Sequence, residues 1–194
     1  MNSDKVIKDN DTITENFMIS NYQGQEAVDN DDGSAYYNTH HNFLVYSGNG
    51  MKSEYSQPRS NPTPRRALTP PTLPRAAPAD DFGGHDNHAF DNVYAYVGQG
   101  FGICGQLKGH VDYFYNNKVI QTGDGNYANG ACSGDGKTVV FNNSVYTPSG
   151  VVTECGTSLA QWQAQGNDPL TTNHSFAELT DDMLLGWAKT VLNV

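Results

Sequence analysis

Short apolar segments recur along the chain at a nearly constant spacing, and an asparagine precedes each of them. Five asparagines stand two positions before an apolar residue, in the pairs Asn16 and Met18, Asn42 and Leu44, Asn92 and Tyr94, Asn117 and Val119, and Asn143 and Val145. Successive asparagines are 26, 50, 25 and 26 residues apart, and a glycine stands eight positions after each of the first four. The chain is therefore built from an internal repeat.

A repeat of about 25 residues with short strands and glycine turns is typical of a parallel β-helix. In that fold, the strands of each coil pair with the coils above and below at a spacing of about 4.8 Å. We expect an all-β solenoid of about five coils. The repeated asparagines are predicted to adopt αL turns and to stack their side-chain amides into a hydrogen-bonded ladder, as scaffold residues rather than catalysts.

The one long spacing, between Asn42 and Asn92, contains a segment of different composition. Residues 57–79 hold all four arginines and seven of the nine prolines, and no acidic residue. Because proline lacks the amide donor and fixes φ, a disordered or polyproline-like loop is predicted. Removing about 25 residues here turns the spacing of 50 into another 25. The segment is either a basic flap over a cleft or a tolerated insertion, and we favour the insertion because long loops cost little closure entropy.

The C-terminal residues have the pattern of a helix. Thr180, Asp181 and Asp182 form a start signal, and apolar residues follow at helical spacing: Met183, Leu184, Trp187, Ala188, Val191 and Leu192. We expect this helix to cap the solenoid. Only about a dozen residues precede the first coil, so we expect the C-terminal part of a longer β-helix or a shortened relative of one. The assembly we expect is a monomer, or a part of that longer β-helix. The predicted segments are N-terminal coils (1–55), the inserted loop (56–80), C-terminal coils (81–170), and a tail with the capping helix (171–194).

Composition and charge exclude some partners. The 194 residues include 20 Gly and 11 Tyr and carry a formal net charge of −10, whereas phosphate binding needs a basic surface, so nucleic acid is excluded. No apolar run approaches the roughly 18 residues of a membrane span, and the first ten residues lack the apolar region of a signal peptide. We therefore expect neither a membrane span nor a signal peptide in this chain.

Several stretches resemble the right-handed parallel β-helix proteins of the pectate-lyase-like, carbohydrate-active type. They are DDGSAY at residues 31–36, GMK at 50–52, GGHDN at 83–87, and the segment 158–169, which is similar to the one that closes the last coil in such proteins. The resemblance implies a right-handed solenoid that binds a polysaccharide or oligosaccharide along one outer sheet. It also implies catalytic carboxylates, lysine or histidine from successive coils. The three cysteines and the glycosylation sequons at Asn10, Asn142 and Asn173 favour a secreted or cell-surface location for the full-length protein.

Four carboxylates are candidates for glycoside hydrolysis. Asp31 and Asp81 each lie eleven positions before a repeated asparagine, so in a solenoid they stack roughly 5 Å apart, the separation expected in a retaining glycosidase. Asp32 and Glu54 are 22 residues apart, again near one coil. Like charges on adjacent coils separate two pKa values and produce one acid and one base. A glycoside hydrolase-like enzyme is our first hypothesis, and it requires no cofactor.

A polysaccharide lyase or uronate epimerase is the alternative enzyme. It needs a base such as Lys52 or His85, and a positive group or metal that neutralises the substrate carboxylate. An acidic protein repels a polyuronate unless calcium bridges the two, so Ca²⁺ is the one ion expected. His85 and His110 both lie seven positions before a repeated asparagine and should stack. For these histidines the competing interpretation is a structural role. For the DDGS stretch at residues 31–34 it is a calcium-binding turn or an Asx turn.

The remaining motifs leave their alternatives open. His40, His41, His85, His88 and His110 lack the spacing of a zinc site. Tyr94, Tyr96, Tyr113 and Tyr115 either stack on sugar rings or fill the core. Cys104, Cys132 and Cys155 are about one coil apart, so neighbouring coils can bring one pair within disulfide range, and the pair is left open. The third functional hypothesis is a non-catalytic carbohydrate-binding or surface module, or a truncated relative of the enzymes.

Overall fold

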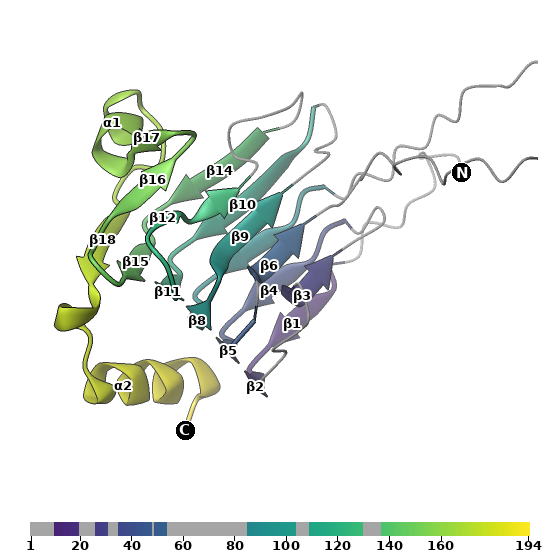
Figure 1. Ribbon diagram of the computed structural model, residues 1–194. Coiled ribbons are helices and arrows are strands. Elements are labelled where there is room, and N and C mark those ends of the chain that lie inside the picture. The colour runs from purple at the N-terminus through teal and green to yellow at the C-terminus, as the bar shows by residue number, and fades with distance from the viewer. Residues whose placement is uncertain are drawn as a thin grey trace, which may run out of the picture.

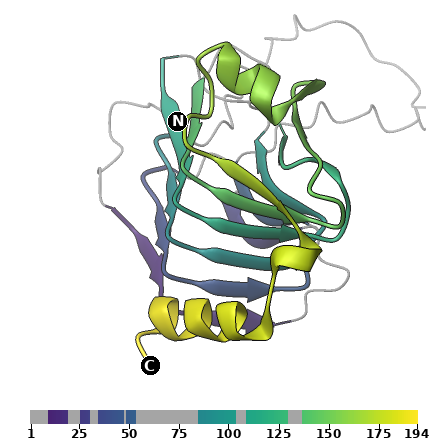
Figure 2. The ribbon, with the colours of Figure 1, turned by 90° about the vertical axis from the view of Figure 1, so that its left-hand side faces the viewer.

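The computed structural model describes residues 10–19, 26–30, 35–47, 49–53, 85–103, 109–129 and 137–194. They form a right-handed parallel β-helix, in which strands from successive coils lie side by side along the solenoid (Figures 1 and 2). The predicted all-β solenoid is confirmed. Its first sheet has five parallel strands, so four coil-to-coil steps separate the first coil from the last.

Three parallel sheets form the faces of the solenoid. The first sheet contains β1 (Thr12–Thr14), β4 (Asn38–His40), β7 (His88–Phe90), β10 (Val111–Tyr115) and β14 (Lys137–Phe141). The second sheet contains β2 (Phe17–Ile19), β5 (Phe43–Val45), β8 (Val93–Val97), β11 (Lys118–Gln121), β15 (Ser144–Thr147) and β18 (Thr172–Ser175). The third sheet contains β3 (Glu26–Asn30), β6 (Asn49–Ser53), β9 (Gln99–Ile103) and β13 (Ala128–Asn129).

A small additional sheet lies near the C-terminal coil. It contains β12 (Gly125–Asn126), β16 (Val152–Glu154) and β17 (Thr157–Ser158), and β16 and β17 are antiparallel. The helix α1 (Leu159–Ala164) follows directly. Ser158 forms a capping box with Gln161, and Leu159 is buried in the main core cluster. Residues 158–169, which resemble the segment that closes the last coil in pectate-lyase-like proteins, thus place Leu159 in the core at the C-terminal coil.

The strands on either side of the long spacing between Asn42 and Asn92 pair with each other as strands of neighbouring coils do. Asn38 pairs with His88 in the first sheet, and Phe43 pairs with Val93 in the second. In the third sheet, Asn49 pairs with Gln99. The 50 residues between Asn42 and Asn92 therefore span one coil step, like the 25 residues of the next coil. The predicted inserted loop, residues 56–80, lies outside the described residues.

The predicted asparagine ladder is present. Each side-chain amide donates to the side-chain oxygen of the next asparagine, with N···O distances of 2.9–3.2 Å from Asn16 through to Asn143. The same oxygens accept the backbone N–H groups of the preceding rungs. At the last rung, the Thr171 hydroxyl accepts the Asn143 N–H at 2.9 Å instead. Four of the five asparagines are buried, so the ladder satisfies polar groups inside the fold.

The αL turn lies one residue earlier than predicted. Glu15, His41, Asp91, Asn116 and Asn142 have φ between 53° and 58°, and each directly precedes a ladder asparagine. The expectation that the ladder residues themselves adopt αL was wrong. The bend in the residue before each rung turns the asparagine inward, where its amide also donates to a backbone carbonyl of a neighbouring coil, as Asn92 does to Thr39. The preceding αL side chain stays at the surface corner between the first and second sheets.

The apolar residues that follow the asparagines form the core. Leu44, Tyr94, Val119 and Val145 have no solvent-exposed surface, and Phe101 and Phe114 pack with them. One repeated glycine has a packing role rather than the expected turn role. Gly100 lies inside β9, where an added Cβ would stand 2.7 Å from Val119 Cγ1. Only a residue without a side chain fits there.

The predicted C-terminal helix is α2 (Asp181–Leu192), with Thr180 as its N-cap. After the 3₁₀ turn η2 (Phe176–Glu178), it runs along the outside of the second sheet (Figures 1 and 2). Its apolar residues pack on an outward apolar surface of that sheet: Phe43, Val45, Val93, Ala95, Ile120 and Tyr146. We expected the helix to cap the solenoid. It covers a side of the coils, because that outer face is apolar and needs burial.

Candidate functional site

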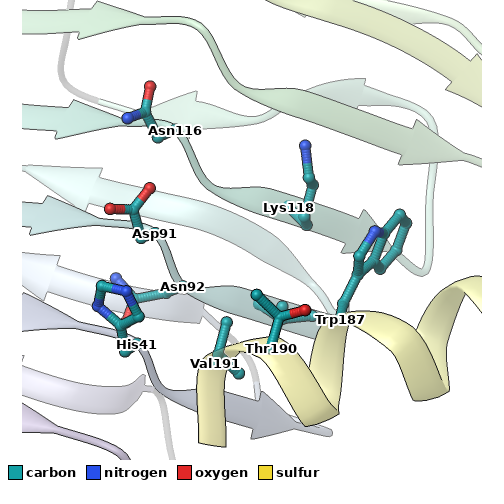
Figure 3. Close-up of a pocket in the computed structure, with 9 residues that line it drawn as sticks. His41, Asp91, Asn92, Asn116, Lys118, Trp187, Thr190 and Val191 are labelled. Carbon is teal, nitrogen blue, oxygen red and sulfur yellow. The ribbon is translucent and has the colours of Figure 1, made fainter. Parts of the chain in front are cut away.

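A pocket of about 330 Å³ lies between α2 and the corner where the first and second sheets meet. The coils contribute six of its lining residues, His41, Asp91, Asn92, Val93, Asn116 and Lys118, and α2 contributes Trp187, Thr190 and Val191. Figure 3 shows His41, Asp91 and Asn116 in a row from three successive coils, with Lys118 and Trp187 beside them. We call this the corner pocket.

The αL turns place the polar wall of the corner pocket. His41, Asp91 and Asn116 all occupy the residue before a ladder asparagine, so their side chains repeat at the strand spacing. The ladder beneath them is buried and fully hydrogen-bonded between coils. A polar row with a rigid backbone follows from this. The row continues on the next coil, where the Asn142 amide donates to Asn116 Oδ1 at 2.8 Å.

Lys118 and Trp187 form the opposite part of the corner pocket. The Lys118 ammonium donates to Ser144 Oγ at 3.0 Å, and both side chains belong to neighbouring strands of the second sheet. Burial lowers the pKa of Lys118, while the nearby Asp91 carboxylate opposes that shift. The Trp187 ring lies 5.5 Å from the Tyr146 ring at an angle of 52°, and Tyr146 in turn stacks on His174. The indole is therefore held by packing on the sheet.

Aromatic rings also form columns on the outer face of the first sheet. His40, Phe90, Tyr115 and Phe141 stack in sequence, with centroids 4.8–5.1 Å apart and planes within 20° of parallel. A second pair, His88 and Tyr113, stacks at 4.4 Å. Rings that stack at the strand spacing cover each other's faces. Since a sugar packs on an open aromatic face, a ring inside such a column is a poor platform for it.

The four tyrosines whose role was open all make ring contacts within the fold. Tyr94 is fully buried and packs on Phe114, and Tyr96 stacks on Tyr46. Tyr113 and Tyr115 belong to the columns described above. Burial raises the pKa of Tyr94 well above that of a free tyrosine, because the phenolate would be desolvated. Tyr94 thus fills the core, whereas Tyr96, Tyr113 and Tyr115 stack on rings of neighbouring coils outside it.

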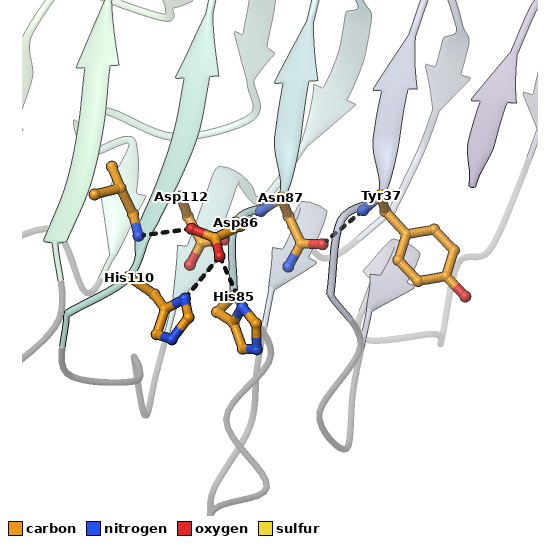
Figure 4. Close-up of polar contacts among 7 residues, drawn as sticks. Tyr37, His85, Asp86, Asn87, His110 and Asp112 are labelled. Atoms are coloured by element: carbon orange, nitrogen blue, oxygen red, sulfur yellow. Dashed lines mark hydrogen bonds and ion pairs between the residues drawn. The ribbon is translucent and has the colours of Figure 1, made fainter. Parts of the chain in front are cut away.

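His85 is the one predicted catalytic residue whose side chain the structure describes. Its Nδ1 lies 3.0 Å from Asp86 Oδ2, and His110 Nδ1 lies 2.6 Å from the same oxygen (Figure 4). The two imidazole centroids are 3.9 Å apart and the rings are tilted by 40°, so the histidines lie side by side on adjacent coils, as their equal offsets predicted. Two residues further on, the buried Asp112 accepts the Asn87 N–H, and burial raises the pKa of Asp112 to about 6. His85 thus belongs to a histidine–carboxylate cluster on two coils.

Among the described residues, no contact brings the other predicted site residues together. Asp31, Asp32, Glu54 and Asp81 lie outside the described residues. Lys52 lies in β6, in register with Asp29 and Gly102. Hydrolysis and elimination at these residues therefore stay predictions. Of the three cysteines, Cys155 is disulfide-bonded, and the other two lie outside the described residues.

The sequence interpretation missed the corner pocket. The sequence did contain a signal for the polar wall of this pocket, because the position before every ladder asparagine is polar. These residues are Glu15, His41, Asp91, Asn116 and Asn142. Lys118 and Trp187 had none, since only the packing of α2 on the second sheet brings residues 69 positions apart into one pocket. The helix was expected at the end of the coils, so its contribution to a site was not anticipated.

No protein-family model matches this chain, and no curated protein or solved structure shows significant similarity to it. The resemblance to carbohydrate-active proteins is thus supported at the level of the parallel β-helix fold alone. Within the described ranges, no helix has both the length and the apolar character that crossing a membrane requires.

Proposed function

We propose that the protein binds a carbohydrate chain and that one sugar unit occupies the corner pocket. The observation that carries this proposal is the composition of the pocket, where the indole of Trp187 lies beside hydrogen-bonding groups of Asp91, Asn116 and Lys118. A sugar ring offers an apolar C–H face and a rim of hydroxyl groups. An aromatic ring and oriented carboxylate, amide and ammonium groups are the complement of those two surfaces.

The dimensions of the corner pocket support a single ring as its occupant. Its volume of about 330 Å³ is at the lower end of the 300–1,000 Å³ typical of small-molecule sites. Further units of a chain would extend along the polar row, over Asn116 and Asn142, which repeats once per coil. The row offers hydrogen bonds at regular steps of about 4.8 Å.

Charge favours a neutral glycan. The whole chain has a formal net charge of −10, which repels a polyanion at long range. Within the corner pocket, Lys118 and Asp91 offer one positive and one negative group, so the local charge is balanced. A neutral polysaccharide or oligosaccharide binds there without the need for a bridging cation.

Binding is favoured over catalysis at this pocket. Hydrolysis of a glycosidic bond normally uses two carboxyl groups that flank the bond. Among the described residues that line the corner pocket, Asp91 is the only one with a carboxylate. The non-catalytic binding module is therefore the function that this geometry supports best, and hydrolysis depends on Asp31, Asp32, Glu54 and Asp81 as a prediction from sequence.

The test is a titration with neutral oligosaccharides followed by tryptophan fluorescence. The chain has two tryptophans, so a Trp162→Phe background leaves Trp187 as the single reporter. We expect a saturable change with at least one glycan, and calorimetry should show binding about tenfold weaker for Trp187→Leu and for Asp91→Asn. Leucine keeps an apolar contact with Tyr146, and asparagine tolerates the αL backbone of residue 91.

Leu185→Ala is the matched control, because Leu185 is exposed on α2 and does not line the pocket. The proposal fails if no neutral glycan binds, or if Trp187→Leu and Asp91→Asn bind as the parent does. New reducing ends in the same mixtures that disappear in Asp31→Asn/Asp81→Asn would instead favour the hydrolase. Unsaturated uronate products that form with calcium would favour the lyase.

A further inference from the structure

A second constellation of side chains lies at a different corner, where the third sheet leads into the first. His85, Asp86 and His110 each offer one ligand atom, and these atoms all lie within 4.8 Å of one another. His85 and Asp86 precede β7, and His110 precedes β10 on the next coil, so one coil step brings them together (Figure 4). None of the three lines the corner pocket.

The backbone holds the carboxylate of this cluster in place. Asp86 has φ = 57°, in the αL region, and its Oδ1 accepts the Val111 N–H at 3.2 Å. Its Oδ2 is left to face both histidine Nδ1 atoms, at 3.0 Å from His85 and 2.6 Å from His110. The Tyr36 ring packs edge-on against His85 at 5.3 Å. Two of the three ligand groups, Asp86 and His85, are thus oriented by contacts outside the cluster, as the groups of a metal site are.

The donor set defines the class of ligand. Two imidazole nitrogens and one carboxylate oxygen suit zinc and similar divalent transition metals, whereas calcium and magnesium prefer oxygen ligands alone. Three protein ligands leave a coordination position for water or another group. The side chains of His85, Asp86 and His110 are 16%, 31% and 33% exposed, so an ion in solvent can reach them.

The ligand atoms must adjust their spacing to hold an ion. Bonds of about 2.0–2.1 Å in a tetrahedral site separate neighbouring ligand atoms by about 3.3 Å. The two Nδ1···Oδ2 distances are 2.6 and 3.0 Å, so these two pairs must move apart by less than about 1 Å. The two histidine ligand atoms lie within 4.8 Å of each other and must reach the same spacing. A neutral imidazole can carry its proton on Nε2 instead, which frees Nδ1 as a ligand.

We propose that His85, Asp86 and His110 form a binding site for a divalent transition-metal ion of the zinc class. The site joins two successive coils, and it does not depend on carbohydrate binding at the corner pocket. The three side chains supply the ligands, and the Val111 N–H positions the carboxylate.

Calorimetry with zinc chloride tests the site. The protein is used as the full chain with thiols alkylated, because cysteine thiolates also bind zinc. We expect one ion per chain. Loss of a direct ligand in Asp86→Asn or His110→Gln should weaken binding by at least about tenfold, since even outer-shell substitutions at metal sites cost 10–100-fold. Asparagine keeps the αL turn and an oxygen for the Val111 N–H.

His174→Gln is the matched control. His174 Nδ1 lies 3.0 Å from Glu178 Oε2, so it forms a histidine–carboxylate pair of the same kind with one histidine. We expect this variant to bind zinc as the parent does. The proposal is overturned if the parent shows no stoichiometric binding, or if Asp86→Asn and His110→Gln, folded by circular dichroism, bind zinc unchanged. Cobalt(II) supplies a test that needs no variant. The parent protein should give a visible spectrum of the four-coordinate type, and added zinc should reverse it.

Discussion

At the scale of single residues, the solenoid has positions that are closed to any side chain. Gly100 is the clearest, because an added Cβ would meet Val119 Cγ1 at 2.7 Å and the Tyr127 carbonyl oxygen at 3.2 Å. The backbone of Gly100 does not need positive φ, so the constraint is one of space. Val119 is buried in the core and the carbonyl belongs to the backbone of the next coil, and neither can move freely.

We therefore predict that Gly100→Ala lowers the free energy of unfolding by about 1–3 kcal/mol, the usual cost of overpacking. Urea denaturation followed by circular dichroism measures the effect. Gly123→Ala is the comparison, since its added methyl group has nothing within 4 Å and should change stability by less than about 0.5 kcal/mol. Equal effects of the two substitutions would show that space at Gly100 is not limiting.

At the scale of elements, the asparagine ladder connects the five coils that the first sheet contains. Asn92 is an interior rung. Its amide donates to Asn117 Oδ1 and to the Thr39 carbonyl, and its oxygen accepts the backbone N–H of Asn42. Replacement with alanine leaves these buried groups without partners, and each such group costs about 1–3 kcal/mol.

We predict that Asn92→Ala destabilises the protein by about 2–4 kcal/mol, again measured by urea denaturation. Asn16→Ala serves as the control because Asn16 is a half-buried end rung and should cost about 1 kcal/mol. If the interior and end substitutions cost the same, the ladder does not act through burial.

The elements also show what could be predicted from sequence and what could not. The spacing of Asn42 and Asn92 predicted the coil register, because a solenoid repeats its local geometry. The αL position was misplaced by one residue, since both positions in the turn are polar and the spacing is the same for either. The position of α2 could not be predicted from its own residues. Its apolar stripe indicates that one face of the helix is buried, but not which surface of the molecule covers that face. The corner pocket depends on that docking and was missed for the same reason.

At the scale of the whole molecule, buried acids control how stability depends on pH. Glu154 accepts the N–H groups of Tyr127 and Ala128 through Oε1, while its Oε2 is buried with no hydrogen-bond partner in the described part of the chain. Burial raises the pKa of Glu154 from 4.5 to about 8. The folded protein then keeps a proton, between pH about 4.5 and 8, that the unfolded chain has lost. Stability therefore falls as the pH rises through this window, and this contribution levels off above about pH 8.

We predict that Glu154→Gln flattens this dependence. Glutamine keeps an oxygen for the two N–H groups and cannot ionise, so relative to the parent the variant should gain about 2–4 kcal/mol between pH 5 and 8. Thermal and urea unfolding at several pH values test it. Parallel pH profiles of the parent and the variant would contradict the assignment, and Gln165→Glu, at an exposed position, controls for the general effect of charge.

The connections between the third and first sheets have lengths that bear on how such a chain can change. Seven residues separate β3 from β4, β9 from β10, and β13 from β14, whereas 34 separate β6 from β7. The paired strands keep one register on both sides of the long connection. Chain length at this corner is thus decoupled from the architecture, so a foreign peptide grafted between Ser53 and His85 should leave the outer faces of the coils in phase.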